Sequence, residues 1–438
     1  MLKAIARAGV LMTFAVAGST AARAADKPQI DTGDTAWLLV ATALVLMMNI
    51  PGLSLFYAGM VRKKNVLATA VQAFAVAAVV TVLWFMVGYS LAFTDGGALN
   101  GVIGSLSRAF GAGLQGSVHE LAKTVPENVF LMYQATFAVI TPAIIAGAFA
   151  ERMKFSAMLW FMALWLLFVY VPVAHWVWGG GFLGAAGVLD FAGGLVVHLN
   201  AGIAGLVCCI VIGKRHGYGT EYMAPHNLVL TLVGTSLLWV GWFGFNAGSA
   251  LSSGELAGNA MLNTHISAAV AALVWMAIEW ASRGKPSVLG ILSGAVAGLG
   301  TITPAAGYVE PWAAMLIGIA AGSICYWASV VLKTRLGYDD SLDVFGVHGV
   351  GGIVGSILVG VFATRAINDV AKGQPVGLVD GNAGQILTQL YGVAVVSAFC
   401  AVATWVILKI VDAMVGLRVT RDEEVEGLDT ALHGERVQ

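Results

Sequence analysis

Long apolar runs alternate with short polar stretches along almost the whole chain. Each run has roughly the 20 residues that an α-helix needs to cross the hydrocarbon core of a bilayer. Lipid offers no partners to backbone N–H and C=O groups, so a spanning run is expected to be helical. We predict eleven spans, of which the eighth is short and glycine-rich: residues 37–59, 67–93, 129–150, 155–179, 194–213, 229–250, 259–281, 288–303, 311–332, 342–364 and 385–415.

Composition identifies this helical protein as a membrane protein. Hydrophobic residues make up 58% of the chain and charged residues only 11%, which leaves too little polar surface for a water-soluble protein of this length. The net charge of -1 provides no basic field, so we expect no nucleic-acid partner. The four cysteines lie within apolar runs without zinc-type spacing, and we interpret them as packing residues.

The N-terminus has the pattern of a secretory signal. Lys3 and Arg7 precede an apolar run over residues 9–18, and Ala-Arg-Ala follows at residues 22–24. The run is too short to span a bilayer, so we predict a cleavable signal peptide over residues 1–24, with an uncleaved interfacial helix as the alternative. The domain of eleven helices would then cover residues 25–415 and a cytoplasmic tail residues 416–438.

Lys and Arg residues are unevenly distributed over the ten connections between the predicted spans. The odd-numbered connections carry eleven of them and the even-numbered connections only four. Because positive residues are retained in the cytoplasm, we expect the odd-numbered connections there. The N-terminus is then outside and the C-terminus inside.

One motif occurs twice. Residues 190–205 and 340–355 both fit Asp-x7-His-x-x-(Ala/Gly)-Gly-Ile-x-Gly. The copies lie on the fifth and tenth predicted spans, and an odd offset gives them opposite directions. We therefore predict that helices 1–5 and 6–10 form inverted-topology repeats, as in many transporters.

The repeat places two histidines at one depth. Asp190 begins its helix at the outer face and Asp340 at the inner face, and His198 and His348 follow eight residues later, about 12 Å along the axis. Both rings are then expected near the middle of the membrane, where they could meet and where desolvation keeps them mostly neutral. A satisfied core histidine is the alternative, but two at matched depth indicate a transport path.

A second group of side chains gathers at the outer end of the predicted bundle. Aromatic faces attract cations, and a hydroxyl can accept a proton from one. An interfacial aromatic belt is the alternative, and composition alone favours it. The group comprises Tyr133, Gln134, Phe137, Trp178, Phe245 and Ser249, with Phe137 and Phe245 slightly deeper, where they could close an entrance.

The predicted path lacks the acidic ring or carbonyl filter of cation channels. A cation that releases a proton, crosses as a neutral molecule and regains the proton avoids the cost of carrying charge through hydrocarbon. Ammonium can do this, whereas potassium cannot.

At these residues the chain resembles the Amt/Mep/Rh ammonium transporter superfamily, and most closely its bacterial Amt branch (AmtB-like). The resemblance covers nearly the whole mature chain. Its motifs lie at residues 50–57, 150–152, 174–181, 190–194, 241–249, 343–349 and 416–419.

The resemblance implies a homotrimer of eleven-helix subunits, each with its own pore and without a cofactor. Tyr133 departs from bacterial relatives, which more often have Phe there. By similarity, the outer ammonium site contains Phe137, Trp178 and Ser249, the gate Phe137 and Phe245, and the pore His198 and His348, with Asp190 as support and Trp242 as lining.

The resemblance also implies function and partners. We expect a multi-pass protein of the bacterial cytoplasmic (inner) membrane that captures ammonium, deprotonates it and conducts ammonia past the histidines, with a separate proton relay left open. The tail resembles a regulatory segment that acts with a PII-type protein of the GlnK class; a disordered tail is the alternative. An ammonium sensor of the same fold, and a membrane enzyme or haem carrier, are the competing functions.

Overall fold

The structure, a computed structural model, describes residues 29–437, so the predicted signal peptide lies outside the described residues. Helices account for all the regular structure there, and the only β pairings in this part of the chain are two isolated bridges. The protein is therefore all-α, as predicted.

Several spans consist of α-helical pieces joined by π-helical turns. The first half of the chain contains α1 (Thr32–Met47), α2 (Ser54–Met60), α3 (Val66–Leu83), α4 (Tyr89–Phe93), α5 (Glu127–Ile145), α6 (Phe155–Trp165), α7 (Val171–Val177), α8 (Phe182–Ala185), η8 (Gly194–Leu199) and α9 (Asn200–Ile212). The second half contains α10 (Leu228–Gly248), α11 (Glu255–Arg283), α12 (Val288–Ile302), α13 (Pro311–Tyr326), α14 (Lys333–Leu336), η10 (Phe345–Gly349), α15 (Val350–Phe362), α16 (Gly384–Val415), α17 (Arg421–Glu426) and α18 (Leu428–His433).

Ten helical segments in the described part of the chain are long and apolar enough to cross a membrane. They correspond to ten of the eleven predicted spans. The remaining one, α12, has 15 residues, so it is a helix but shorter than a usual span. That α12 crosses the membrane stays a prediction.

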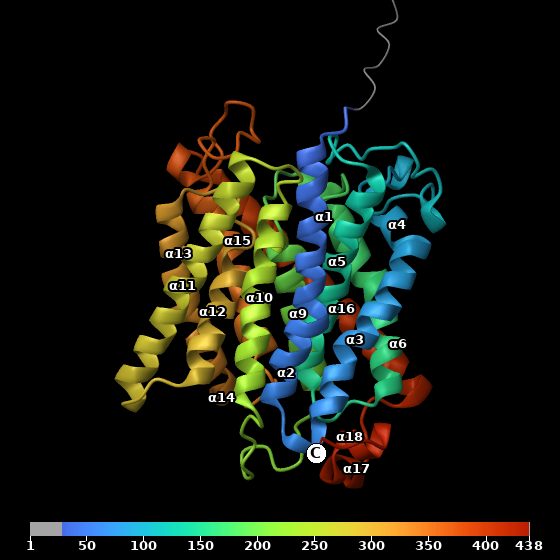
Figure 1. Cartoon of the computed structure of the whole chain (residues 1–438), viewed down its shortest axis with the longest axis vertical. Helices are drawn as coiled ribbons and strands as arrows, with labels where there is room; N and C mark the ends of the chain where they lie inside the picture. Colours follow the sequence, from blue (N-terminus) through green and yellow to red (C-terminus); the bar gives the residue numbers. More distant parts are fainter. Residues whose placement is uncertain (1–28, 438) are drawn as a thin grey trace, which may run out of the picture.

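The helices run roughly along one direction, with α1 and α10 side by side near the centre of the view in Figure 1. α11, α12 and α13 form one flank, and α3, α4 and α6 form the other. The small helices α17 and α18 lie at one end, which we call the tail face.

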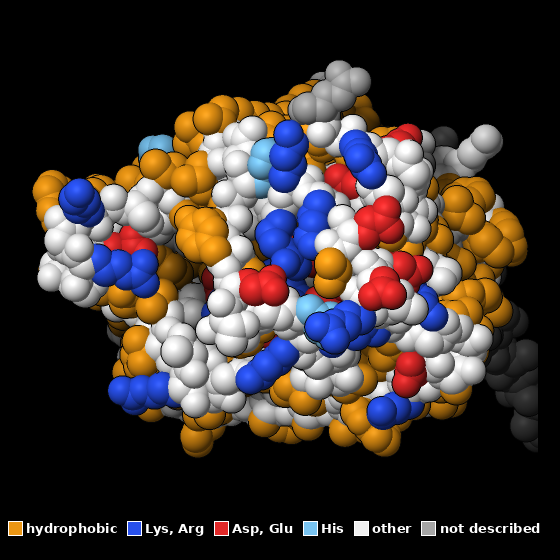
Figure 2. Space-filling view, turned by 90° about the horizontal axis from the view of Figure 1, so that it is seen from below, with side chains coloured by type: hydrophobic (Ala, Val, Ile, Leu, Met, Phe, Trp, Pro, Cys, Tyr) orange, Lys and Arg blue, Asp and Glu red, His pale blue; other side chains and the backbone are white. Residues whose placement is uncertain are grey.

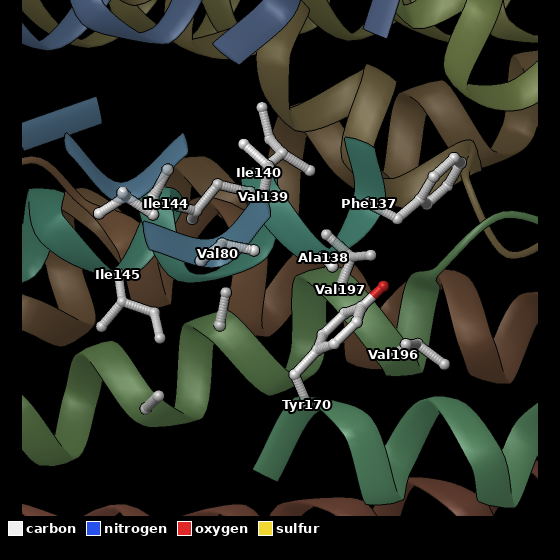
Figure 3. Close-up of a cluster of buried hydrophobic side chains, with 14 of the residues drawn as sticks. Val80, Phe137, Ala138, Val139, Ile140, Ile144, Ile145, Tyr170, Val196 and Val197 are labelled. Atoms are coloured by element: carbon white, nitrogen blue, oxygen red, sulfur yellow. The ribbon is translucent and has the colours of Figure 1, made fainter. Parts of the chain in front are cut away.

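The segment that contains α5 is the most deeply buried of the ten, because 89% of an apolar stretch of 18 residues in it is buried inside the protein. Figure 3 shows Val80 of α3, Tyr170, and Val196 and Val197 of η8 together with six side chains of α5: Phe137, Ala138, Val139, Ile140, Ile144 and Ile145. α5 also contacts η8, the turn that carries His198.

Glycines bring the two repeats into contact. A Cβ atom on Gly202 of α9 would lie 2.1 Å from the Cα of Gly349 at the end of η10. The backbones therefore touch where the two motifs cross, which only small residues allow.

A buried ion-pair cluster closes the tail face. Arg215 bridges Glu151 and Asp339 with N–O distances of 3.0 and 2.8 Å, and Arg62 also pairs with Glu151 at 2.9 Å. Arg152, fully buried, donates to the backbone oxygens of Ala148 and Asp339 at 3.0 and 2.6 Å. Figure 2 shows positive side chains gathered on this face.

The tail is ordered and packs onto the same face. The carboxylate of Asp429 in α18 accepts the backbone N–H groups of Leu67 and Ala68, at 3.1 and 2.8 Å, in the first turn of α3. Such a carboxylate complements the positive end of a helix. The tail therefore forms two short helices instead of a disordered segment, and one of them caps α3.

Candidate functional site: a histidine pair beside stacked aromatic rings

The two histidines of the repeated motif meet inside the protein. Their Nδ1 atoms are 3.2 Å apart, and the rings are nearly parallel, with centroids 5.3 Å apart. Both are buried, with exposed fractions of 1% for His198 and 5% for His348. One Nδ1 can donate to the other only if the two rings share a single proton there, which leaves each Nε2 for another partner.

The Nε2 atom of His198 is buried and has no hydrogen-bond partner within residues 29–437. An unsatisfied buried polar atom is costly and often marks a place where a guest binds. Trp242 stacks on His198, with ring centroids 5.3 Å apart and an interplanar angle of 17°. Its indole N–H donates to Thr303 Oγ1 at 3.0 Å, which fixes the ring.

Each histidine lies on a π-helical turn that opens its helix. η8 begins after Gly193, whose φ of 117° suits glycine and lets the chain turn back on itself. The Asp190 carboxylate then accepts the N–H groups of Gly193, Gly194, Leu195 and Val196 at 2.6 to 3.1 Å. Burial raises the pKa of this carboxyl, and the four hydrogen bonds oppose that rise. Asp190 thereby fixes the turn that carries His198.

A narrow apolar cavity lies beside the histidines. The centre of a water-sized molecule can move through about 10 Å³ of it, which is room for about one such molecule. The two histidines, Trp242 and Phe245 line it together with Met48, Leu53, Phe56, Ile140, Ile144, Leu238 and Val296. Such a wall suits a small uncharged guest and disfavours an ion.

Phe245, which lines this cavity, forms a stacked pair with Phe137. Their rings stack with centroids 4.2 Å apart, and both side chains are buried. Phe245 also lies 6.0 Å from the His198 ring centroid.

Trp178 packs against Phe137, one of the two stacked rings. Its ring is perpendicular to that of Phe137, with centroids 6.0 Å apart, and its indole N–H donates to the Asp190 backbone oxygen at 2.8 Å. Asp190 therefore supports both Trp178 and the turn of His198. Trp178 is only partly buried and also lines a polar cavity of about 580 Å³, with Asp95, Glu120 and the Arg108–Glu127 ion pair.

Ser249 follows the last residue of α10, and Tyr133 of α5 lies beside this helix end. The Ser249 hydroxyl donates to Phe245 O at 2.9 Å, which leaves its lone pairs available as acceptors. The Tyr133 hydroxyl is within 3.0 Å of Gly244 O and Phe245 O and 3.3 Å from Ser249 Oγ. The Tyr133 hydroxyl therefore helps to hold the end of α10 in place. Gln134 is buried next to Tyr133, with an Oε1 that has no partner among residues 29–437.

Sequence reasoning missed most of the apolar lining and Thr303. Ile140 and Ile144 are one turn apart on α5, three and seven residues after Phe137, so helical periodicity from the gate could have identified them. Thr303 carries no such signal, because its contact with Trp242 depends on how α12 packs against α10.

The described residues contain no group of three or more His, Cys, Asp or Glu side chains that could hold a metal ion. The site instead combines stacked aromatic rings with paired imidazoles beside an apolar cavity.

Sequence comparison places the chain among known proteins. The sequence model of the Ammonium Transporter Family matches residues 36–438. The chain is 48% identical over 407 residues to a putative ammonium transporter of Methanothermobacter thermautotrophicus, covering 93% of this chain and 98% of the relative. It is also 48% identical over 404 residues to the ammonium transporter of Bacillus subtilis, covering 92% and 98%.

Solved structures resemble this fold as well. The crystal structure of Saccharomyces cerevisiae Mep2 gives a TM-score of 0.84 at 37% identity, covering 90% of this chain and 89% of Mep2. A sensor Amt protein gives 0.84 at 28% identity, covering 92% and 98%. With a match over nearly the whole chain in both sequence and structure, the protein belongs to the Ammonium Transporter Family.

Proposed function

We propose that this protein carries ammonium across a membrane by capturing the cation outside the gate, removing its proton and passing ammonia beside the histidines. The observation that carries the proposal is the unpartnered Nε2 of His198 in an apolar cavity behind a closed aromatic gate. The relatives named ammonium transporters support the same substrate.

The outer step uses Trp178, Phe137 and Ser249. A cation is attracted to the aromatic faces of Trp178 and Phe137, and the Ser249 hydroxyl can accept a hydrogen bond from it. The narrow apolar cavity beyond Phe245 then selects the neutral form, because a charge would lose its hydration there without compensation. Potassium has no neutral form and is excluded by the same cost.

The wider arrangement is also a proposal. We infer eleven crossings, including α12, with the N-terminus outside and the tail face in the cytoplasm. The excess of Lys and Arg in the odd-numbered connections supports this orientation. The repeats would be inverted in topology, and the site of Trp178 would open to the outside.

Assembly and location follow from the family resemblance. We propose a homotrimer in a bacterial cytoplasmic membrane, with a cleaved signal peptide, regulated on the tail face by a PII-type protein of the GlnK class. The ordered tail supports a regulatory surface, since α17 and α18 pack beside the ion-pair cluster of Arg215 and Arg62.

Uptake of labelled ammonium by cells that lack their own transporter tests the mechanism. We expect a double His198→Ala, His348→Ala variant to lose selectivity for ammonium over potassium or to lose uptake altogether. His265→Ala is the matched control, because this histidine is exposed on α11 and should leave uptake unchanged. Unaltered uptake and selectivity in the double variant, present in the membrane at normal amounts, would refute the twin-histidine mechanism.

A sensor is the second candidate, and the likeness to the sensor Amt protein favours considering it. A sensor would bind ammonium without carrying it. Purified protein in vesicles that binds labelled ammonium yet shows no flux above empty vesicles would favour this function over transport.

A further inference from the structure

The repeated motif holds its two histidines in different ways. The Asp190 carboxylate accepts four backbone N–H groups at the start of η8. In the second copy, Asp340 Oδ2 accepts the Phe345 N–H at 2.8 Å, but Oδ1 is buried without a hydrogen-bond partner among residues 29–437. The turn that carries His348 is therefore fixed more weakly than the turn that carries His198.

One of the differences between the two copies adds a charge next to Asp340. Gly193, which donates to Asp190, corresponds to Asp343, which also has a positive φ of 60°. Asp343 introduces a second carboxylate, and this carboxylate forms an ion pair with Lys333 of α14. Asp340 therefore has an acidic side chain beside it, at the position where the first copy has a glycine without a side chain.

Asp340 is closely surrounded by ionisable groups. Burial and, to a smaller extent, the neighbouring Asp343 raise its pKa from 3.8 to about 6, while Lys333 opposes the rise. The carboxyl is therefore expected to gain its proton as the pH falls through about 6. The groups that face it are Tyr57 of α2, Cys208 and Cys209 of α9, Tyr338, Asp343 and Lys333.

Protons can reach Asp340 from the tail face. Asp340 is only 1% exposed, but the neighbouring side chains of Asp343 and Lys333 are 31% and 20% exposed. The Lys333 ammonium also donates to the Asp340 backbone oxygen at 3.4 Å. The pair therefore connects the buried carboxyl with the solution on that side.

We propose that Asp340 is a titratable positioning residue for His348: its charged form holds the N–H at the start of η10, and protonation from the tail face loosens this turn and slows transport. The inference rests on the proposed function, since it concerns the histidine that the guest passes. It makes transport sensitive to acid on one side of the membrane only.

The experiment uses the full chain in vesicles, with orientation established by the access of trypsin to the C-terminal tail. Flux of labelled ammonium is measured while the pH of the compartment facing the tail is varied from 5 to 8 and the other side stays at 7. We expect an approximately tenfold decrease between pH 8 and pH 5, because about a tenth of Asp340 remains charged at pH 5.

Asp340→Asn should be insensitive to tail-side pH and remain near the low rate of the wild type at pH 5. Asp412→Asn is the matched control, because this carboxylate lies at the end of α16 near the tail and caps Leu417 instead. The control should keep the wild-type pH profile. An Asp340→Asn variant that follows the wild-type profile would overturn the proposal.

A second variant keeps the proposal testable if Asp340→Asn fails to fold. Asp343→Asn removes the like charge and frees Lys333, so the midpoint of the wild-type pH profile should move to lower pH. An unmoved midpoint, or a wild-type flux that ignores tail-side pH, contradicts the role of Asp340 while leaving transport intact. Absence of wild-type flux at every pH would instead contradict the proposed function itself.

Discussion

His198 and His348 face each other through their Nδ1 atoms at 3.2 Å, although 150 residues separate them in the chain. Asp190 controls one side of this contact and Asp340 the other, each at the start of a π-helical turn. The pair therefore depends on two capping carboxylates with different strengths.

Removing the stronger cap should destabilise the turn that carries His198. In Asp190→Ala, four backbone N–H groups lose a charged acceptor in a buried place, while the backbone oxygen that accepts from Trp178 remains. We expect a loss of stability of several kcal/mol, about 1–3 kcal/mol for each buried group left unsatisfied, and little uptake. Thermal unfolding in detergent and uptake assays check this. Asp369→Ala, in an exposed loop, should behave as the wild type.

Opening the gate should weaken selectivity. Phe137→Ala removes one ring of the stack with Phe245 and joins the outer cavity to the histidine cavity. We expect ammonium flux to persist while discrimination against potassium decreases, as measured by competition between the two ions in vesicles. Phe74→Ala removes a ring that is 60% exposed on α3 and serves as the control. Full discrimination in Phe137→Ala would count against a gate at this position.

The glycine contact between the repeats should tolerate no side chain. Gly202→Ala places a Cβ atom 2.1 Å from Gly349 Cα, so α9 and η10 must move apart and the histidines with them. We expect a lower melting temperature and reduced flux. Gly258→Ala is a matched control, because a Cβ there meets nothing within 4 Å; it should be neutral or stabilise α11 by about 0.5–1 kcal/mol.

The ion-pair cluster on the tail face should make the protein sensitive to acid. Burial raises the pKa of Glu151, but Arg215 and Arg62 outweigh it, so the net pKa is below the ordinary 4.5. A lowered pKa gives stability that is present above pH 4.5 and lost as the pH falls through the folded-state value. Glu151→Gln should therefore unfold more readily at pH 7 and resemble the wild type in strong acid. A destabilisation independent of pH would contradict this account.

Asp340 should show the opposite dependence. Its pKa rises from 3.8 to about 6 on folding, so the folded protein loses stability as the pH increases between these values. Asp340→Asn removes a charge that is costly at neutral pH and should raise stability by on the order of 2–3 kcal/mol above pH 6. No gain is expected at pH 4. Melting curves of Asp340→Asn and the wild type at pH 7 and pH 4 test the sign of this effect. A melting temperature of the variant below that of the wild type at pH 7 would show that the charge of Asp340 does not destabilise the protein.

The sequence alone predicted the helical class, ten of the spans and the two histidines of the repeat, because hydrophobic length and a duplicated motif are local signals. It also identified the aromatic group around Phe137, although composition favoured an interfacial belt. In the structure, Phe137 stacks on Phe245 and contacts Trp178.

Only the tertiary structure decided the details of the site. Thr303 reaches Trp242, and the Tyr133 hydroxyl turns to the end of α10, because helices that are distant in sequence pack together. Asp190 and Asp340 occupy the same position of the repeated motif, so the motif did not show that their carboxylates accept different numbers of hydrogen bonds. That number depends on the backbone torsion angles of the residues after each aspartate. The length of the apolar runs determines which residues enter the membrane. Side-chain contacts between helices decide what those residues can bind.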